Sequence, residues 1–340
     1  MPGTGDKVPP VSEVAGRAVL ITGAGGFIGG HLAAALVRDG AEVRAFVRYN
    51  SRGELGTLSW FEPAFADELD VVLGDLRDLE SVMKASEGID VIFHLGAQIA
   101  IPYSYLNPRD FFETNVLGSL NVAQAALKHD VGRVVQVSSS EVYGTAQQIP
   151  ITESHPLEPQ SPYAASKVGA DKLMDSYHRT HELPVTVVRP FNTYGPHQSA
   201  RAIVPTIVAQ ALGSDMLELG SLEPRRDLTF VSDTVAGIIA GAGPASAIGK
   251  TVQLGTGEDV SIGELVGLVA EILGKQLDVR HDPRRVRPPQ GEVQRLTSDP
   301  GLADRLLSWQ PKVGLHDGLA QTIEWIAAHP HHYRPSEYAI

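Results

Sequence analysis

Short apolar runs alternate with longer, helix-length stretches from Ala18 to about Arg189. Nearly every position within these runs is apolar, as expected for strands buried on both faces of a parallel sheet. The alternation predicts an α/β fold, a doubly wound parallel sheet of the Rossmann type with helices on both faces. We expect strands at Ala18–Thr22, Glu42–Val47, Val71–Leu73, Val91–His94, Arg133–Ser138 and Val185–Arg189, and helices at His31–Arg38, Phe111–His129 and Tyr163–Thr180.

The rhythm changes after Phe191, where prolines divide the sequence into shorter elements. We therefore predict a Rossmann domain at 17–190 and a smaller C-terminal α/β lobe at 191–328, with some chain crossing back to the sheet. The Pro-, Gly- and charge-containing ends are expected to form a disordered lead at 1–16 and a tail at 329–340. Helices of the lobe are expected at Ile203–Leu212, Ser232–Ala242, Ile262–Leu273 and Leu315–Ala328.

Composition narrows the partners of this chain. The 28 Lys and Arg residues against 40 Asp and Glu residues give a formal net charge of −12, which disfavours binding to nucleic acid or to an anionic membrane. A phosphate-bearing ligand would therefore need locally placed arginines. The absence of cysteine excludes disulfides and thiol nucleophiles and favours a cytoplasmic location. No apolar run reaches the roughly 18 residues of a membrane helix, and the C-terminal histidines lack acidic or thiol companions, so no metal site is expected.

A glycine-rich turn joins the first strand to the first helix. The segment runs Gly23-Ala24-Gly25-Gly26-Phe27-Ile28-Gly29. Glycines at positions 23, 26 and 29 permit a tight turn, close approach of the backbone to a pyrophosphate, and close packing of helix against strand. The N-terminus of the helix then faces the phosphates. Because the turn lies between a strand and a helix at the start of a βαβ series, it predicts a dinucleotide site.

The end of the second strand bears on the choice of dinucleotide. An acidic residue there would accept hydrogen bonds from the adenosine ribose of NAD, but the strand ends in Val47-Arg48-Tyr49-Asn50. Arg48 suits a 2′-phosphate, so we expect NADP, with NAD as the alternative if Arg48 only stacks on the adenine. Asp75, which follows the third strand, is expected to reach the adenine amino group.

A tyrosine and a lysine lie four residues apart at the start of a predicted helix, in Tyr163-Ala164-Ala165-Ser166-Lys167. They share one face of that helix, and a neighbouring cation favours the phenolate. Such a pair suits abstraction of a hydroxyl proton while hydride leaves the same carbon. The strand before it ends in Ser138-Ser139-Ser140-Glu141, and the carboxyl ends of strands are where active sites of open α/β sheets lie.

These motifs together resemble the extended short-chain dehydrogenase/reductase family, in its group of nucleotide-sugar epimerases, dehydratases and decarboxylases. The resemblance covers roughly residues 17 to 328 and is closest to the nucleotide-diphosphate N-acetylhexosamine 4,6-dehydratases. It rests on the glycine turn, Asp75, His94-Leu95-Gly96-Ala97, Asn115, the Ser-Ser-Ser-Glu segment, Tyr163 with Lys167, Arg189-Pro190-Phe191-Asn192 and the segment from Ala97 to Tyr105.

The resemblance implies a role for each matching residue. Ser139 would hydrogen-bond the C4 oxygen of the sugar, Tyr163 would be the base, and Lys167 would bind the nicotinamide ribose of a tightly bound, recycled cofactor. The implied cofactor contacts are Gly23, Gly26, Phe27, Ile28, Gly29, Arg48, Asp75, Leu76, Leu95, Ala97, Asn115, Tyr163 and Lys167. The implied contacts to a nucleotide-diphosphate sugar are Asn192, Arg226 and Arg287 at the diphosphate, Ser104, and Arg201 near the base, although Arg201 is equally consistent with a solvated loop.

The resemblance also implies a homodimer. The helices at Phe111–His129 and Tyr163–Thr180 would pack against their mates as a four-helix bundle. Leu117, Leu120, Val168 and Leu173 are candidates for that face, although each is equally consistent with packing on its own sheet.

Glu141 distinguishes the reactions of this group. A 4,6-dehydratase needs a base for the C5 proton and an acid for the C6 hydroxyl, and Glu141 stands where the dehydratases carry that base. Ser140 replaces the usual acid, so Glu141 would also protonate the leaving hydroxyl, with Ser140 as a relay. We therefore expect a 4,6-dehydratase. A 4-epimerase or a UDP-glucuronate decarboxylase-like enzyme remains the alternative, and a simple dehydrogenase or a non-catalytic regulator is less consistent with the motifs.

Overall fold

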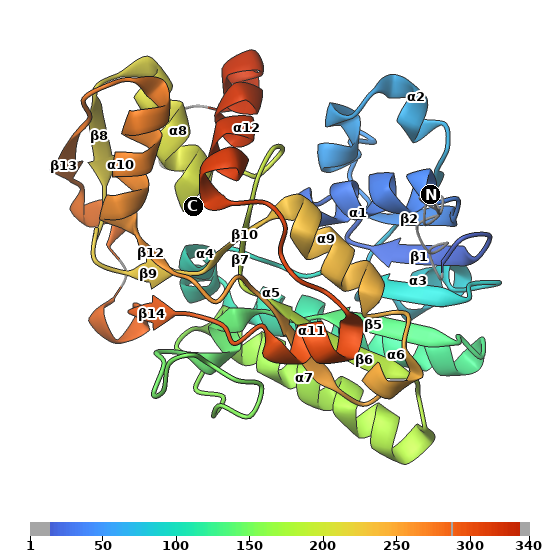
Figure 1. Cartoon of the computed structure of the whole chain (residues 1–340). Helices are drawn as coiled ribbons and strands as arrows, with labels where there is room; N and C mark the ends of the chain where they lie inside the picture. Colours follow the sequence, from blue (N-terminus) through green and yellow to red (C-terminus); the bar gives the residue numbers. More distant parts are fainter. Residues whose placement is uncertain (1–13, 287, 334–340) are drawn as a thin grey trace, which may run out of the picture.

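Seven parallel strands form the central sheet of the protein, a computed structural model that describes residues 14–286 and 288–333 (Figure 1). The strand order is β11-β6-β5-β4-β1-β2-β3, which confirms the predicted doubly wound parallel sheet. The strands are β1 (Ala18–Thr22), β2 (Glu42–Arg48), β3 (Asp70–Gly74), β4 (Val91–His94), β5 (Arg133–Val137), β6 (Val185–Pro190) and β11 (Thr251–Leu254).

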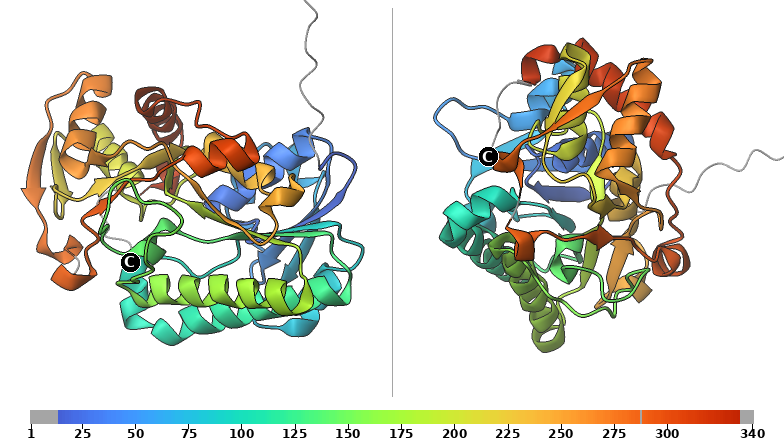
Figure 2. Two further views of the ribbon diagram at one scale, coloured as in Figure 1. Left: turned by 60° about the horizontal axis from the view of Figure 1, so that its bottom comes forward. Right: turned by 90° about the vertical axis from the view of Figure 1, so that its left-hand side faces the viewer.

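Helices cover both faces of this sheet (Figures 1 and 2). One face carries α1 (Phe27–Arg38), α9 (Val231–Ala240) and α11 (Gly301–Leu307), and the other carries α3 (Leu79–Ala85), α6 (Gly118–Lys128) and α7 (Pro162–His181). Successive strand residues point to opposite faces: Ile21 packs in the cluster under α1 and α9, and Leu20 packs in the cluster under α6 and α7. This is why the strand sequences are apolar throughout.

The strand order places a crevice between β1 and β4. The chain winds outward from β1 through β2 to β3, and then returns to β4 on the other side of β1. At such a switch point the connections diverge, and a ligand site opens beyond the carboxyl ends of the two strands. The glycine turn follows β1, and the segment that begins with Leu95 follows β4.

The expected helix at Phe111–His129 is interrupted. The chain forms α4 (Ile101–Leu106) and α5 (Pro108–Phe112), then a π-helical turn at Glu113–Leu117 that continues into α6. Inside the turn, the Asn115 side chain accepts a hydrogen bond from the Gln98 backbone N–H at 2.7 Å and donates one to the Gln98 carbonyl at 3.1 Å. The interruption therefore coincides with an asparagine that clamps the loop after β4.

The C-terminal lobe combines three small sheets with three longer helices (Figure 1). The first sheet pairs β7 (Asn192–Tyr194) with β10 (Leu228–Phe230), and the second joins β9 (Arg225–Arg226), β12 (Val260–Ser261) and β14 (Arg295–Leu296). The third sheet pairs β8 (Met216–Leu219) with β13 (Asp278–His281), and the helices are α8 (Ile203–Gly213), α10 (Ile262–Leu273) and α12 (Leu315–Ala328). From within this half of the chain, β11 crosses back and pairs with β6.

Residues 329–333, expected to belong to a tail, are instead packed on the body of the protein. The His332 ring stacks on Trp60 with centroids 4.0 Å apart, and Tyr333 donates a hydrogen bond to the Gln198 carbonyl at 3.1 Å. Aromatic rings account for this docking, since they bury a large apolar surface. Val14, within the expected lead, is also buried in the core. Residues 1–13 and 334–340 lie outside the described part of the chain.

Within residues 14–286 and 288–333, no helix is long and apolar enough to span a membrane.

Candidate active site

The glycine turn brings three backbone segments into close contact. Gly23 has a φ of +75°, and a Cβ there would lie 2.8 Å from the Cα of Gly96. A Cβ on Gly29 would lie 2.2 Å from the Gly23 carbonyl oxygen. Neither glycine position therefore has room for a side chain, and α1 begins directly at the turn, with Gly26 as its N-cap. The first N–H groups of a helix lack intrahelical partners, so this end of α1 fits the pyrophosphate of a dinucleotide.

Two adjoining hollows lie beside this turn, and Arg48 at the end of β2 borders both. The first is also lined by Asp75, Leu76 and Ala97, and the second by Gly23 and Gly26, so many of the residues expected to hold the cofactor gather here. Phe27, Ile28 and Gly29 form the start of α1, and Leu95 follows β4.

Asp75 is held by a neighbour that the sequence analysis did not name. Arg77 pairs with the Asp75 carboxylate at 2.5 Å and with Asp110 at 3.4 Å. The hydrogen bond from Arg77 lowers the pKa of Asp75, so the carboxylate stays ionised and oriented at the edge of the hollow. The position of Arg77, two residues after Asp75, is the local sequence signal from which this pair could have been predicted.

A chain of buried hydrogen bonds fixes the ends of β1 and β4. Ser119 donates to the Asn115 carbonyl at 2.6 Å, so its oxygen accepts from His94 Nε2 at 3.0 Å. His94 Nδ1 then accepts from the Thr22 hydroxyl at 2.6 Å, and that hydroxyl accepts from the Gly96 N–H at 3.1 Å. Burial, helped by the charge of Lys167, lowers the pKa of His94 to about 3. The imidazole is therefore neutral with one defined tautomer.

Tyr163 and Lys167 lie in the first turns of α7. The helix begins after Ser161, whose hydroxyl accepts from the Ala164 N–H at 3.1 Å, with Pro162 at the first helical position. Lys167 Nζ donates to the Val137 carbonyl at 2.7 Å, which anchors it at the end of β5. The phenol of Tyr163 is hydrogen-bonded to Ser139. Three of the expected catalytic residues thus meet at one point.

Burial sets the ionisation of this pair. Burial raises the pKa of Tyr163 to about 12. The charge of Glu141 also raises this pKa, whereas the hydrogen bond to Ser139 lowers it. Burial also lowers the pKa of Lys167 to about 8. The protein alone therefore keeps the phenol protonated, and more positive charge near it would be needed for the phenolate to form.

Glu141 lies on the 3-10 turn Ser140–Tyr143, directly after Ser139 and Ser140. Its backbone N–H donates to the Ser139 hydroxyl at 3.2 Å, and its charge acts on Tyr163. The Glu141 side chain is half-buried, whereas Ser140 is 3% exposed. Glu141 therefore lies at the carboxyl end of β5, near enough to Tyr163 for its charge to act on the phenol.

Of the expected substrate contacts, Arg226 is the most constrained. It lies on β9, is buried, and pairs with Glu292 at 3.2 Å. Asn192 is half-buried on β7, and its backbone N–H donates to the Asp227 carbonyl at 3.1 Å. These two residues lie on strands of two different small sheets of the lobe, which Asp227, directly after Arg226, links through its hydrogen bond with Asn192. Glu292 was not predicted from the sequence, because nothing local links it to an arginine 66 positions earlier.

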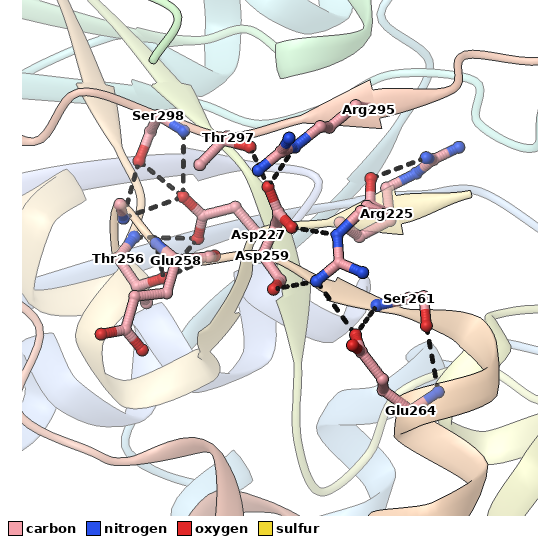
Figure 3. Close-up of polar contacts among 12 residues, drawn as sticks. Arg225, Asp227, Thr256, Glu258, Asp259, Ser261, Glu264, Arg295, Thr297 and Ser298 are labelled. Carbon is pink, nitrogen blue, oxygen red and sulfur yellow. Dashed lines mark hydrogen bonds and ion pairs between the residues drawn. The ribbon is translucent and has the colours of Figure 1, made fainter. Parts of the chain in front are cut away.

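Two carboxylates hold β9 in place (Figure 3). Asp227 accepts from the backbone N–H groups of Thr256, Gly257 and Ser298 and from two of their hydroxyls, at 2.6–3.1 Å. Asp259 accepts from Arg225, Arg295 and Thr297. Figure 3 shows each carboxylate among its hydrogen-bond donors. The position of Arg226 is therefore fixed by charged groups on both of its neighbours in the chain.

The other expected substrate residues are not gathered with this pair. Ser104 is fully buried and donates to the Ile101 carbonyl at 2.7 Å, so its hydroxyl is not directed into an open site and we do not retain it as a contact. Arg201 is exposed on the loop before α8. Arg287 lies outside the described residues. Asn115 is buried and holds Gln98 and Ser166, which gives it a structural role in shaping the crevice.

Comparison with known proteins identifies the family and agrees with the fold. The family model described as GDP-mannose 4,6 dehydratase matches residues 20–322. A UDP-glucose 4-epimerase of Mycolicibacterium smegmatis is 34% identical, covering 90% of this chain and 97% of that protein. A dTDP-glucose 4,6-dehydratase of Streptomyces antibioticus is 35% identical, covering 90% and 91%. The structure of a dTDP-glucose 4,6-dehydratase from Streptomyces venezuelae with NAD bound has a TM-score of 0.82 at 33% identity, covering 94% of this chain and 100% of that one.

The fold and these matches define the class: an enzyme of the short-chain dehydrogenase/reductases that act on nucleotide sugars, a group that depends on a nicotinamide dinucleotide. The chain belongs to the GDP-mannose 4,6-dehydratase family, whose relatives include both 4,6-dehydratases and 4-epimerases.

The glycine turn gives a direct test of the cofactor site. Gly29→Ala places a methyl group against the Gly23 carbonyl, and we expect the forced backbone shift to cost about 1–3 kcal/mol. Dinucleotide binding, measured by fluorescence titration, should weaken about 5- to 150-fold. Gly267→Ala in α10, where a Cβ meets nothing within 4 Å, is the control and should bind as the parent does. Unchanged binding in Gly29→Ala would show that the dinucleotide lies elsewhere.

Proposed function

We propose that the protein is a nucleotide-sugar 4,6-dehydratase with a tightly bound nicotinamide dinucleotide that is recycled in each turnover. The enzyme oxidises C4 of the sugar, eliminates water across C5 and C6, and returns the hydride to C6 to give a 4-keto-6-deoxy sugar. The observation that carries the proposal is the carboxylate of Glu141 beside Tyr163, in the crevice where Ser139 and Lys167 also meet.

The first step uses the catalytic pair. Tyr163 takes the proton of the C4 hydroxyl, Ser139 hydrogen-bonds the same oxygen, and the Lys167 ammonium holds the nicotinamide ribose and favours the phenolate. When bound, the dinucleotide supplies the acceptor and later the donor of the hydride. Its oxidised ring also carries a positive charge, which is the sign needed to lower the raised pKa of Tyr163.

The elimination uses Glu141. The C4 ketone acidifies the C5 proton, and the Glu141 carboxylate removes it. The same group then protonates the departing C6 hydroxyl, with Ser140 as a relay, so that the C5 proton and the C6 hydroxyl leave together as water. As C6 accepts the hydride, C5 takes up a proton from solvent, and Tyr163 releases the proton of the C4 hydroxyl to solvent. A half-buried carboxylate in this crevice would be costly without such a task.

Asn192, Arg226 and Arg287 are proposed to bind the diphosphate, and Arg201 to border the nucleotide base. Arginine suits phosphate oxygens because its planar group donates two parallel hydrogen bonds. The buried position of Arg226 next to Asn192 supports this assignment. Glu292 then has to share Arg226 with the substrate.

A 4-epimerase is the alternative that a specific observation favours, since one relative at 34% identity is named a UDP-glucose 4-epimerase. That reaction needs Ser139, Tyr163 and Lys167, but it does not use Glu141. A UDP-glucuronate decarboxylase-like reaction would need a further cation for the C6 carboxylate. The role of Glu141 therefore separates these functions.

Glu141→Gln keeps the shape of the side chain and removes its basicity. We expect elimination to slow by about 10²–10⁴, the usual contribution of a positioned general base, while reduced cofactor and a 4-keto sugar still form on the enzyme. Mass spectrometry of a panel of nucleotide sugars measures the loss of water. In heavy water, the parent enzyme should place deuterium at C5, and the variant should not.

Tyr163→Phe is the control for this experiment, because it should abolish the first oxidation as well. Near-normal loss of water in Glu141→Gln would show that the base is another residue. A product of unchanged mass without deuterium at C5 would identify an epimerase. Reduced cofactor accumulating with turnover would indicate a simple dehydrogenase.

The cofactor is proposed to be NADP, because Arg48 borders both hollows beside the glycine turn and β2 does not end in a carboxylate. Glu54 lines the second hollow and pairs with Arg52 at 3.4 Å. It is the carboxylate that would instead serve the ribose of NAD.

Titration should therefore show tighter binding of NADP than of NAD. Arg48→Ala should reduce the ratio of the two affinities by about tenfold or more, because a charge-assisted hydrogen bond to the 2′-phosphate is lost. Arg38→Ala, at the far end of α1, should leave the ratio unchanged. An equal ratio in the parent and in Arg48→Ala would show that Arg48 does not contact the 2′-phosphate.

The helical face around α5 and α6 supports the proposal of a homodimer. Leu106, Phe112 and Leu117 are 70%, 44% and 50% exposed, and they follow one another along α4, α5 and the π-helical turn. Leu120 and Leu173 are half-buried. Val168 packs against the core cluster that contains Val142, so it contributes less to such a face. Exposed leucine and phenylalanine side chains in one region mark an interaction surface.

Light scattering at low micromolar concentration should give about twice the 36.4 kDa of one chain. Leu117→Glu should shift the protein to the monomer, because a central apolar contact contributes about 2 kcal/mol or more. Met216→Glu changes an equally exposed residue of the C-terminal lobe and should leave the dimer intact. A monomeric parent would contradict this proposal.

A further inference from the structure

A buried carboxylate lies one helical turn beyond Lys167. Asp171 on α7 is 3% exposed, and its Oδ2 accepts from the Ser138 hydroxyl at 2.7 Å and from Arg189 Nε and a terminal guanidinium nitrogen at 3.1 and 2.9 Å. Its other oxygen, Oδ1, has no hydrogen-bond partner among the described residues. The carboxylate is therefore not fully satisfied by hydrogen bonds, and part of its charge remains to act on neighbouring groups.

Arg189 extends this contact to the turn that carries Glu141. A guanidinium nitrogen of Arg189 donates to the Tyr143 hydroxyl at 3.0 Å, and the guanidinium lies 5.1 Å from the centroid of the Tyr143 ring. Gln253 of β11 donates to the same hydroxyl at 2.8 Å. Tyr143 ends the 3-10 turn in which Glu141 lies. One ion pair thus joins α7, β6 and the turn after β5.

Charge balance gives Asp171 a second consequence. Lys167 and Arg189 are both about 4% exposed, so two cations are buried near a single carboxylate. Buried charges are tolerated only with compensating partners. Lys167 hydrogen-bonds a neutral carbonyl, and among the described residues Asp171 is the carboxylate whose charge raises its pKa against the lowering effect of burial.

The other charged and titratable groups around the pair do not replace this carboxylate. His94, from β4, is neutral because its pKa is about 3. The charge of Glu141, from the turn, raises the pKa of Tyr163. The charge of Asp171 also raises the pKa of Tyr163, but this is the smallest of the named effects. Arg189, from β6, is a cation that pairs with Asp171, and Tyr143, from the turn, hydrogen-bonds Arg189, so neither supplies an anion to Lys167.

We propose that Asp171, held by Arg189, is a positioning residue for the catalytic pair: its carboxylate compensates the buried ammonium of Lys167, and its ion pair fixes the Glu141 turn against α7. The proposal rests on the function proposed above, in which Lys167 must be an ammonium to hold the nicotinamide ribose and to favour the phenolate of Tyr163.

Asp171→Asn removes the charge at nearly constant shape. A protonated lysine that loses a nearby anion releases its proton more easily, so the pKa of Lys167 falls. In the parent protein, the affinity for dinucleotide and the rate of C4 oxidation should decline as the pH rises through about 8. In Asp171→Asn, the same decline should begin about one pH unit lower. The control is Asp175→Asn, because Asp175 lies one turn further along α7 and pairs with Arg179 on the surface. This variant should leave the pH of the decline unchanged.

A second variant separates charge compensation from folding. Asp171→Asn leaves the Arg189 guanidinium buried without its carboxylate and should lower the thermal unfolding temperature. The double variant Asp171→Asn with Arg189→Gln removes both charges and should regain stability, but it should keep the shifted pH dependence. Asp171→Glu retains the charge and should keep the parent's pH dependence.

Each outcome decides the proposal. A loss of stability without a shift in pH dependence, or a double variant with the parent's pH dependence, would reduce Asp171 to a structural partner of Arg189 and overturn it. Dinucleotide binding requires no sugar. Its pH dependence therefore tests the role of Asp171 even if none of the nucleotide sugars is converted, which would count against the proposed function alone.

Discussion

The structure depends on keeping a positive charge at the end of β5 without solvent around it. Lys167 is buried there and donates to the Val137 carbonyl, so the strand, helix α7 and the turn after β5 must keep fixed relative positions. Neutral His94 on one side and the ionised pair of Asp171 and Arg189 on the other meet this requirement without placing a second cation against the ammonium. The crevice is therefore ordered before any ligand enters, which is the condition for electrostatic effects to be strong there.

The C-terminal lobe meets a different requirement, that of holding the buried Arg226 in a fixed position within short, irregular elements. Its three-stranded sheet contains only two-residue strands, which backbone hydrogen bonds alone do not make rigid. Asp227 and Asp259 supply the missing rigidity through side-chain hydrogen bonds to β9 and its neighbours (Figure 3). The acidic residues that give the chain its net charge thus include the ones that hold Arg226 in place.

Much of the fold was accessible from the sequence, because buried parallel strands are continuous apolar runs. β1 and β4 match their predicted bounds, and α10 and α12 match theirs. β11 was not predicted as a strand, since Thr251–Leu254 is short and contains Gln253, whose burial depends on Tyr143 far away in the chain. The π-helical turn at Glu113–Leu117 has no local signal. Within the site, the sequence motifs predicted Ser139, Glu141, Tyr163 and Lys167. Asp171 and Glu292 were not predicted, because each pairs with an arginine that no local pattern links to it.

The late position of β11 in the sequence has a consequence for synthesis of the protein on the ribosome. β6 pairs with β5 on one side and with β11 on the other, yet β11 emerges only after β7, α8, β8, β9, β10 and α9 have been made. At about 5–20 residues per second, the outer edge of β6 stays open for several seconds. An open strand edge is a template for pairing with other chains. Vectorial folding of the Rossmann half therefore cannot finish before the first part of the lobe, up to β11, has been translated, and nascent chains in this interval are the ones most in need of a chaperone.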